Sequence, residues 1–420
     1  MLYYATGSAT TDLSSDDLAA ILGEVFSQFS DRQKVLAIPP DITRFYSRAG
    51  EISCIAHDHF GERLKDILPA LGTHKPMTEA ELAKMYPSIP TSLFREHDWR
   101  EGIETVGEVP SEFVKEVTEG IWDQPWSAQL NRLVSRGGHD LILSIGQVVP
   151  HEVIGMANYN KNLFVGCGGS KGINESHFIG AAYGMERMMG RADTPLRRIF
   201  NYASDNFTNH LPFLYILTVV APREDGSLAT RGLYIGDDTE CFEQAAKLSA
   251  EVNFTQLEER PKKIVVFLEE GEFHSTWLGN KAVYRTRMAI ADEGELVILA
   301  PAVGTFGEDA EIDRLIRKYG YRTTPEVMQF LKENEDLASN LSAAAHLIHG
   351  SSEGRFRITY CPGKLTRDEI EGVGYGYADC EEMLGRYNPE ELTDGWNTLP
   401  DGERIFFISN PALGLWSAKS

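Results

Sequence analysis

The stretch KVLAIPPDITR (34–44) places a short apolar run directly before a polar loop, and runs of the same kind recur along the chain. Such runs, bounded by Gly, Pro or charged residues, are typical of buried β-strands. The others are DLILSIG (140–146), KIVVFLE (263–269), ELVILAP (295–301), RITYCP (357–362) and RIFFIS (404–409). Apolar spacing between them predicts helices over 16–29, 240–252, 309–319 and 324–348. Strands that alternate with helices predict an α/β fold with mainly parallel sheets, and ligands bind beyond the carboxyl ends of such strands.

The chain length predicts two domains, because 420 residues exceed what one hydrophobic core usually holds. The polar stretch QLEERPKK (256–263) follows a helical pattern, contains a proline and precedes a new strand. We therefore expect a cofactor-binding and catalytic domain over 1–258 and a second α/β domain over 259–420. Each should hold a mainly parallel sheet flanked by helices, with the active site in the cleft between the domains. The last residues are expected to pack back on the first domain.

Composition limits the classes of partner. Hydrophobic residues make up 42% of the chain and charged residues 24%, as in globular proteins, and the net charge is −22. That charge repels nucleic acid and anionic membranes, so neither is an expected partner. No apolar run approaches the roughly 20 residues that cross a bilayer, and the first residues, MLYYATGSATTDLSSDD, do not resemble a signal peptide. We expect a soluble cytoplasmic protein.

The cysteines and the net charge direct the search for a site. The five cysteines are scattered without a CxxC pair, which argues against a disulfide framework and against a zinc site built on thiolates. If the substrate is an anion, local positive charge must overcome the field of the whole chain. The residues of interest are therefore Arg, Lys and His in loops that follow strands.

Two loops near the N-terminus carry such residues. Asp41, Thr43 and Arg44 directly follow the strand at 34–38, where a guanidinium could hold a phosphate or carboxylate with two hydrogen bonds; the alternative is a loop clamp and surface charge. His74 precedes a capping box formed by Thr78 and Glu81, so we expect it in a turn before a helix N-terminus. The positive end of that helix favours a neutral imidazole that can act as a base. The alternative is a turn histidine bonded to backbone.

The region 146–181 is the richest in such residues and opens directly after the strand at 140–145. It contains His151, Lys161, Lys171 and His177 among seven glycines, which permit close backbone approach to a ligand. The run GCGGSKG resembles an anion-binding loop, although it does not have the spacing of a nucleotide P-loop. A generic glycine turn is the alternative.

The sequence His57-Asp58-His59 offers a different interpretation, in which two histidines and nearby carboxylates hold the metal of a hydrolase. Alternating histidines lie on one side of a strand but diverge on a helix. The surrounding residues favour a helix, which argues against this metal site.

Taken together, the loops resemble the nickel-pincer-dependent lactate racemase family. The early Asp-x-Thr-Arg motif of that family is similar to DITR (41–44), its Gly-x-His-Arg/Lys segment to GTHK (72–75), and its Asn-His-Asp segment to EHD (96–98). Its Pro-His segment is followed by a lysine after ten residues and by a histidine after sixteen more. His151, Lys161 and His177 have both of these intervals without a gap.

The chain also departs from the family pattern. The family has Gly-Phe-Ser-Gly-Gly-Arg-Lys before the cofactor lysine, whereas this chain has GMANYNK (155–161), and Lys171 is therefore a rival attachment residue. Of the Tyr-Gln-x-x-Lys pattern in the second domain, only Tyr284 matches. Met288 stands at the lysine position, and Arg285 or Arg287 could supply the cation that clamps a substrate carboxylate.

The resemblance implies a racemase or epimerase that inverts a 2-hydroxy acid, such as lactate or a sugar acid, by hydride transfer to a nickel-pincer nucleotide (a pyridinium dithiocarboxylate mononucleotide with nickel). By this resemblance Lys161 is linked to the cofactor through a thioamide, and His177 ligates nickel. His74 and His151 exchange the hydroxyl proton on opposite faces. The remaining cofactor-binding residues are Asp41, Thr43, Arg44 and Tyr284.

Implied partners are a small anionic substrate and the enzymes that make and insert the cofactor. Two alternatives stay open, a non-catalytic relative that binds a sugar acid or nucleotide, and the metal-dependent hydrolase. The identity of the 2-hydroxy acid and the oligomeric state are also left open.

Overall fold

The computed structural model describes residues 1–223 and 227–419, and the chain divides into two compact units. The first unit comprises Met1–Ser176 and Met188–Asn253, and the second comprises His177–Arg187 and Phe254–Ser420. The domain boundary predicted at residue 258 places residues 177–187 in the first domain, whereas in the structure they belong to the second unit. Among the described residues, no helix is long and apolar enough to cross a membrane.

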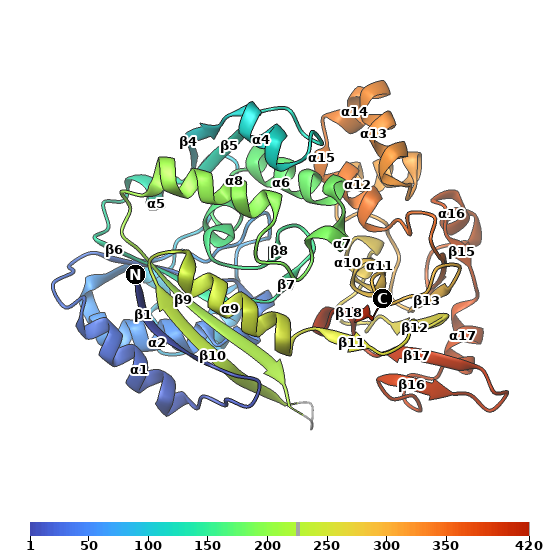
Figure 1. Ribbon diagram of the computed structural model, residues 1–420, viewed down its shortest axis with the longest axis horizontal. Coiled ribbons are helices and arrows are strands. Elements are labelled where there is room, and N and C mark those ends of the chain that lie inside the picture. The colour runs from blue at the N-terminus through green and yellow to red at the C-terminus, as the bar shows by residue number, and fades with distance from the viewer. Residues whose placement is uncertain (224–226, 420) are drawn as a thin grey trace. The chain divides into compact units, whose positions relative to one another are not determined.

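The first unit is built on a six-stranded sheet with the order β1-β10-β9-β6-β2-β3. Figure 1 shows β1, β10 and β9 side by side at one edge of this sheet. Neighbours from β9 to β3 run parallel, and β1 and β10 are antiparallel additions at one edge. The strands are β1 (Leu2–Gly7), β2 (Val35–Ile38), β3 (Leu64–Ile67), β6 (Leu141–Gln147), β9 (Phe213–Pro222) and β10 (Leu228–Gly236). All four residues of β2 are buried, as its continuous apolar run predicts for a strand covered on both faces.

Helices of the first unit cover this sheet through apolar faces. The core contains the buried face of α1 together with residues of β2, β3 and β6. The helices are α1 (Ser15–Ser27), α2 (Ala49–Phe60), α3 (Glu79–Met85), α4 (Ser111–Val117), α5 (Arg132–Arg136), α8 (Pro195–Ala203) and α9 (Thr239–Val252). Helical turns are η1 (Ile42–Ser47), η2 (Gly61–Arg63), η3 (Thr91–Leu93), η4 (Asn162–Gly166) and η5 (Ser204–Thr208). Two small antiparallel pairs complete the unit, β4 (Ile103–Val109) with β5 (Trp126–Asn131) and β7 (Pro150–His151) with β8 (Gly155–Met156).

The second unit contains its own six-stranded sheet, with the order β15-β14-β13-β12-β17-β16. All neighbours are parallel except β16 and β17. The strands are β12 (Lys263–Phe267), β13 (Glu295–Ala300), β14 (Arg357–Pro362), β15 (Gly376–Tyr377), β16 (Gly395–Thr398) and β17 (Arg404–Ile408). A separate parallel pair joins β11 (Thr255–Leu257) to the last strand, β18 (Trp416–Ala418), and both lie in this unit. The predicted α/β class with mainly parallel sheets is confirmed.

Several helices flank the second sheet and connect its strands. They are α10 (Thr276–Gly279), α11 (Lys281–Thr286), α12 (Ala310–Tyr319), α13 (Thr324–Glu333), α14 (Glu335–Ala338), α15 (Leu341–His349), α16 (Arg367–Gly372), α17 (Cys380–Arg386) and the turn η6 (Pro411–Leu413). Two further helices, α6 (Ser170–Tyr183) and α7 (Met185–Met188), contain the segment 177–187.

The long helix predicted over 324–348 is wrong, because three helices occupy that range. Asn334 is extended between α13 and α14, and the Asn340 side chain accepts a hydrogen bond from the Ala343 amide at the start of α15. Asparagine competes with the helix for backbone hydrogen bonds, so it ends one helix and caps the next.

Candidate functional site

Three loops predicted to carry chemistry follow three neighbouring parallel strands of the first unit. β2 pairs with β3 on one side and with β6 on the other, so the segments after residues 38, 67 and 147 leave the same edge of the sheet. An isolated parallel bridge between Pro40 and Ala70 continues this pairing into the loops. The carboxyl edge of these strands is where a parallel sheet presents ligand-binding groups.

A direct contact joins the first two loops. His74 Nδ1 lies 2.6 Å from Asp41 Oδ2, and the other carboxylate oxygen accepts a hydrogen bond from the Thr43 amide at 3.1 Å. Asp41 is 5% exposed, whereas the His74 side chain is 60% exposed. An ionised carboxylate only accepts, so the histidine donates from Nδ1, and its Nε2 lone pair is left on the exposed side.

The electrostatics of Asp41 fit this contact. Burial would raise the pKa of the carboxyl, but hydrogen bonds from His74 and Thr43 outweigh burial and lower the pKa. Asp41 therefore stays ionised throughout the neutral range. The resemblance assigns Asp41 to the cofactor, and the structure shows that its oxygens contact His74 and Thr43.

The turn that carries His74 is fixed by its own sequence. Thr78 caps α3 together with Glu81, which confirms the predicted capping box. Gly72 has a φ of +58° and donates its amide to Gly166 O at 2.8 Å, which ties the turn to η4. His74 lies in a turn before the N-terminus of α3, as predicted, but the contact of its side chain with a carboxylate was not expected.

His151 lies in the short strand β7 and is buried. Its Nδ1 accepts a hydrogen bond from the Val153 amide at 3.1 Å and lies 3.7 Å from Glu152 Oε2. Each of the two predicted proton-transfer histidines thus has a carboxylate on its Nδ1 side. At His74 the ring donates to this carboxylate, whereas at His151 the Nδ1 lone pair is taken by the Val153 amide and the proton of the neutral ring lies on Nε2.

Lys161 directly precedes η4, whose Asn162 side chain donates to Ile38 O and Ser144 Oγ, both at 3.1 Å. These bonds anchor the lysine segment to the ends of β2 and β6. Burial, and the nearby positive charge of Arg44, lower the pKa of Lys161 to about 8. A measurable fraction of the amine is therefore neutral at pH 7.

The groups that influence Lys161 connect the loops. Besides Arg44, the carboxylates of Glu152 and Asp41 act on the amine and oppose the lowering of its pKa. The lysine is therefore within electrostatic range of the DITR loop and of the residue that follows His151. The first unit brings together Asp41, Arg44, His74 and Lys161, which the sequence predicted from three separate stretches.

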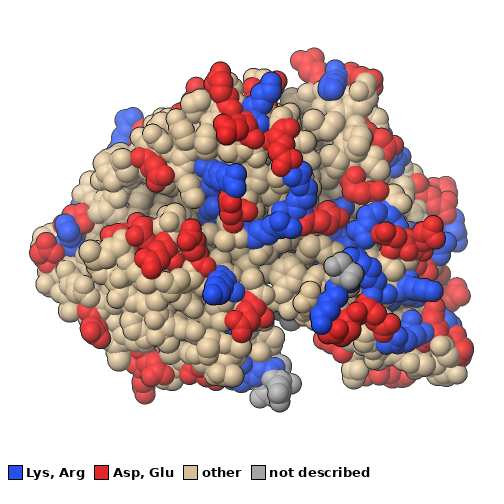
Figure 2. All heavy atoms as spheres, viewed as in Figure 1, with Lys and Arg blue, Asp and Glu red and all other residues tan. Residues whose placement is uncertain are grey.

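Local positive charge at this edge contrasts with the chain as a whole. The net charge is −22, and acidic and basic side chains are interspersed on the face shown in Figure 2. Arg44 and Lys161 supply cations where an anionic cofactor or substrate would bind. Local positive charge of this kind was expected for an anionic substrate, because the chain as a whole is negatively charged.

His177 and Lys171 both lie on α6. His177 is partly exposed and falls within the part of the helix that belongs to the second unit, so its predicted role as nickel ligand stays a prediction. Lys171 is exposed in the first turn of the helix, whereas Lys161 is partly enclosed. Surrounding protein groups can hold a partly enclosed amine in one position, so Lys161 stays the predicted attachment residue.

Tyr284 and Arg285 lie on α11 and are buried. Arg287 follows the helix, is 1% exposed and donates from Nε to Glu186 Oε1 at 2.6 Å, within the second unit. Of the two arginines proposed to clamp a substrate carboxylate, Arg287 already has a carboxylate partner in the protein.

The metal site of the hydrolase interpretation lacks a ligand cluster. His57 and His59 lie on α2, where residues two apart diverge, and the His59 ring packs 5.5 Å from the Phe26 ring. Within residues 1–223 and 227–419, no three His, Cys, Asp or Glu side chains are grouped to hold a metal ion.

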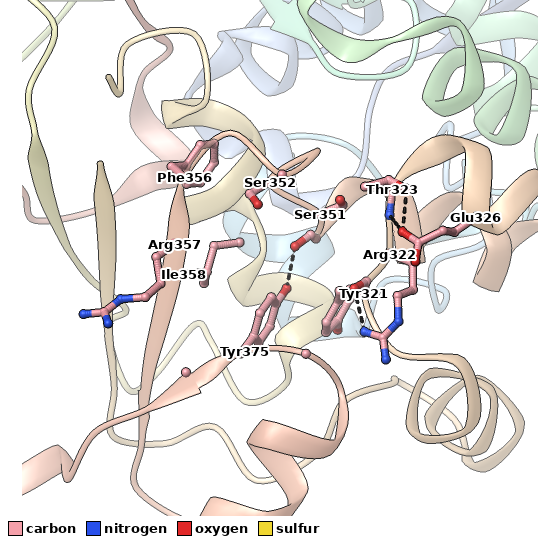
Figure 3. A pocket seen from close by; sticks show the side chains of 14 residues that line it. Tyr321, Arg322, Thr323, Glu326, Ser351, Ser352, Phe356, Arg357, Ile358 and Tyr375 are labelled. Carbon is pink, nitrogen blue, oxygen red and sulfur yellow. Dashed lines mark hydrogen bonds between the residues drawn. The ribbon is translucent and has the colours of Figure 1, made fainter. Parts of the chain in front are cut away.

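The second unit contains a pocket of about 230 Å³ at the amino end of β14 (Figure 3). Its polar groups largely bond within the protein. Arg322 Nη1 donates to Tyr321 O at 3.0 Å, and Tyr375 Oη donates to Gly350 O at 2.8 Å. We assign this pocket no role in the site.

Sequence reasoning missed Glu152, Asn162 and Arg197. Glu152 directly follows His151, and Asn162 directly follows Lys161, so their positions beside predicted site residues could have indicated them. Arg197 lies on α8, and its distance from Lys161 in the sequence did not indicate that the two residues are close in the structure.

Comparison with known proteins places this arrangement in a class. Residues 23–188 match the family model described as the lactate racemase N-terminal domain, a range that includes Asp41, His74, His151, Lys161 and His177. Residues 23–188 of this chain are thus similar to the N-terminal domain of the lactate racemase family, the family that the sequence motifs resemble.

Two solved structures are similar over nearly the whole length. A crystal structure of a protein from Thermotoga maritima, a structural genomics target, is 24% identical with a TM-score of 0.81, covering 99% of this chain and 100% of that chain. The lactate racemase apoprotein from Thermoanaerobacterium thermosaccharolyticum is 15% identical with a TM-score of 0.72, covering 97% and 93%. At these identities the two structures establish the shared fold. No curated protein matches the chain.

Proposed function

We propose that the chain is a racemase or epimerase that inverts the hydroxyl-bearing carbon of a 2-hydroxy acid, with a nickel-pincer nucleotide attached to Lys161. The observation that carries this proposal is the Asp41–His74 contact, which lies on the same sheet edge as a lysine whose pKa is lowered. A base with an orienting carboxylate and a reactive amine are what the reaction requires of the protein.

The residues present suit such a cofactor. Covalent attachment through an amine needs the neutral form, which a pKa of about 8 supplies for Lys161 at physiological pH. Arg44 offers a guanidinium for the nucleotide phosphate, and His177 offers an imidazole of the kind that binds nickel. When bound, the cofactor would supply the two-electron acceptor that side chains cannot.

The protein's own contribution is proton transfer and orientation. His74 would accept the hydroxyl proton at Nε2, while Asp41 holds the ring and stabilises the imidazolium that forms. His151 would return a proton, with Glu152 on its Nδ1 side. Inversion needs two proton carriers because the two enantiomers present their hydroxyl groups from different sides. Asp41 would stabilise the protonated form of His74, whereas His151 would exchange its proton at Nε2, because its Nδ1 accepts from the Val153 amide.

The attachment is tested by intact-protein mass after co-expression with the enzymes that make and insert the cofactor. We expect the adduct on the wild type and on Lys171→Ala, which changes the exposed rival lysine, and no adduct on Lys161→Ala. An adduct that persists on Lys161→Ala excludes this attachment.

The activity is tested by incubating loaded protein with single enantiomers of lactate, malate, aromatic hydroxy acids and aldonic acids, and reading product stereochemistry. We expect inversion of at least one of them. Fully loaded protein that inverts none of them contradicts the proposed activity.

That negative outcome would favour a non-catalytic relative, for which the second unit gives one specific observation. Arg287 is paired with Glu186, and Met288 stands where the family pattern has lysine. Such a protein would bind a sugar acid or nucleotide without inverting it.

A further inference from the structure

The guanidinium of Arg197 is buried in the first unit, and no carboxylate among the described residues bonds to it. Arg197 is 2% exposed, and its carbon Cζ lies 4.1 Å from the centre of the Phe242 ring. Burial lowers its pKa to about 9, which leaves it charged at neutral pH. Its hydrogen bonds, within the part of the chain that the structure describes, go to one short loop and to no acidic side chain. Burying a charge without a partner of opposite charge is unfavourable, so the hydrogen bonds that Arg197 makes have to compensate for the lost hydration.

That loop is the one that leads into Lys161. Arg197 Nη2 donates to Met156 O at 2.7 Å, and Nη1 donates to Asn158 O at 3.3 Å and to the Asn160 side-chain oxygen. The guanidinium therefore holds three of the five residues that precede the lysine. Its planar fork can contact several acceptors at once, which a lysine ammonium cannot do in the same geometry.

The loop backbone needs restraint. Asn158 and Tyr159 have φ values of 65° and 58°, so two successive residues with side chains adopt the left-handed conformation. Asparagine visits this region more readily than most residues, whereas tyrosine does so rarely. Tyr159 is held by packing on Phe242, with ring centres 5.2 Å apart, and Asn158 Oδ1 accepts from the Tyr159 amide at 2.7 Å.

This position is also where the chain departs from its family pattern. The pattern Gly-Phe-Ser-Gly-Gly-Arg-Lys has two glycines and an arginine where this chain has Asn158, Tyr159 and Asn160. Glycine adopts positive φ without a steric penalty. Here a left-handed backbone is formed without glycine, and the Arg197 guanidinium from α8 contacts Asn160, the residue that stands where the family pattern has arginine.

We propose that Arg197 is a positioning residue for Lys161, which holds the left-handed backbone of residues 156–160 and so fixes where the lysine amine lies. This inference rests on the proposed function, in which Lys161 carries the cofactor. The positive charge of Arg197 also contributes to the lowered pKa of Lys161.

Two readouts test this role. The first is the fraction of protein that carries the cofactor adduct after co-expression, measured by intact mass. The second uses cofactor-free protein, in which the rate of Lys161 acetylation by acetic anhydride is followed against pH by peptide mass spectrometry, with the Lys171 peptide as internal reference. The matched control is Arg198→Gln, because Arg198 is the adjacent arginine, is exposed and pairs with Asp193.

For Arg197→Gln we expect the adduct fraction to fall several-fold and the acetylation profile of Lys161 to move to higher pH, because a neighbouring positive charge has been removed. Adding Asn158→Gly should recover much of the adduct, since glycine adopts positive φ without restraint, but should leave the acetylation profile shifted. A change in fold stability alone would not move that profile. Arg198→Gln should match the wild type in both readouts.

Folded Arg197→Gln with a wild-type adduct fraction and a wild-type acetylation profile overturns the proposal. Failure of Asn158→Gly to recover the adduct overturns the backbone part of it. If Arg197→Gln does not fold, Arg197→Lys keeps the charge but loses the fork, and we expect a reduced adduct fraction with an unchanged profile. A wild-type adduct fraction in Arg197→Lys would also overturn the proposal.

The two proposals fail separately. An adduct on Lys161→Ala contradicts the proposed attachment, whereas the acetylation profile of cofactor-free protein still reports whether Arg197 acts on Lys161.

Discussion

Asp41 and His74 lie 33 residues apart in sequence and meet because β2 and β3 are neighbours in the first sheet. The contact joins a buried carboxylate to an exposed ring, so the ring has a fixed orientation while its outer nitrogen faces solvent. The resemblance alone assigns Asp41 to the cofactor. The contact with His74 adds a second possible role for Asp41, which is to orient a base.

Asp41→Asn distinguishes these roles. If Asp41 orients His74, loaded Asp41→Asn should keep a normal adduct fraction and KM, while kcat for the inverted acid falls by about tenfold or more. If Asp41 instead holds the nucleotide, the adduct fraction should fall. Intact mass and steady-state kinetics on the same preparation decide between these outcomes.

The lowered pKa of Asp41 also sets a pH window. A carboxyl whose pKa is lower in the folded state contributes stability that is fully present above its unfolded value, about 3.9. That contribution is lost only as the pH falls below this value through the folded pKa. At neutral pH, titration of Asp41 should therefore change neither stability nor activity.

For individual residues, the sequence predicted which loops carry the site and which residue types they contain, but it did not predict which residues contact each other. Asp41, His74 and Lys161 were found because each follows a strand and matches a family motif. The Asp41–His74 bond could not be predicted, because it depends on which strands are neighbours. Arg197 could not be predicted either, since its role depends on α8 lying against residues 156–160.

The start of helix α3 is determined by the local sequence around Thr78. Its hydroxyl accepts from the Glu81 amide and caps α3, directly after the turn that carries His74. Thr78→Ala should lower the free energy of unfolding by about 1 kcal/mol, because helix amides lose their partner. Thr78→Ser keeps the hydroxyl and should stay close to the wild type. Urea unfolding of the variants checks this, and equal loss in both would contradict a capping role.

The predicted strands and most predicted helices are confirmed, because continuous apolar runs and helical spacing are local signals. β9, FLYILTVVAP, was not predicted, although its apolar run was available in the sequence. β10 gave a weaker signal, since it contains Gly232 beside a shift in register. β1 is an edge strand that is only partly buried, so its pattern is not clearly apolar.

For the whole molecule, the net charge of −22 affects how an anion reaches a site with local positive charge. Salt shortens the range of the repulsion, from about 30 Å at 0.01 M to about 8 Å at 0.15 M. We expect kcat/KM for the inverted 2-hydroxy acid to rise over this range while kcat stays constant. The neutral amide of the same acid should be insensitive if it is turned over. A fall of kcat/KM with salt would mean that the positive charge of Arg44 dominates the approach.

The sheet of the second unit ends in short strands on both sides, β15 with two residues and β16 with four. An exposed edge strand can recruit further chains by continuing its hydrogen-bond ladder, and a long, flat edge does so most readily. Edges this brief offer little template for such recruitment. Concentrated preparations should therefore resist fibrous aggregation through this sheet, which favours the crystallisation and spectroscopic work that large amounts of protein require.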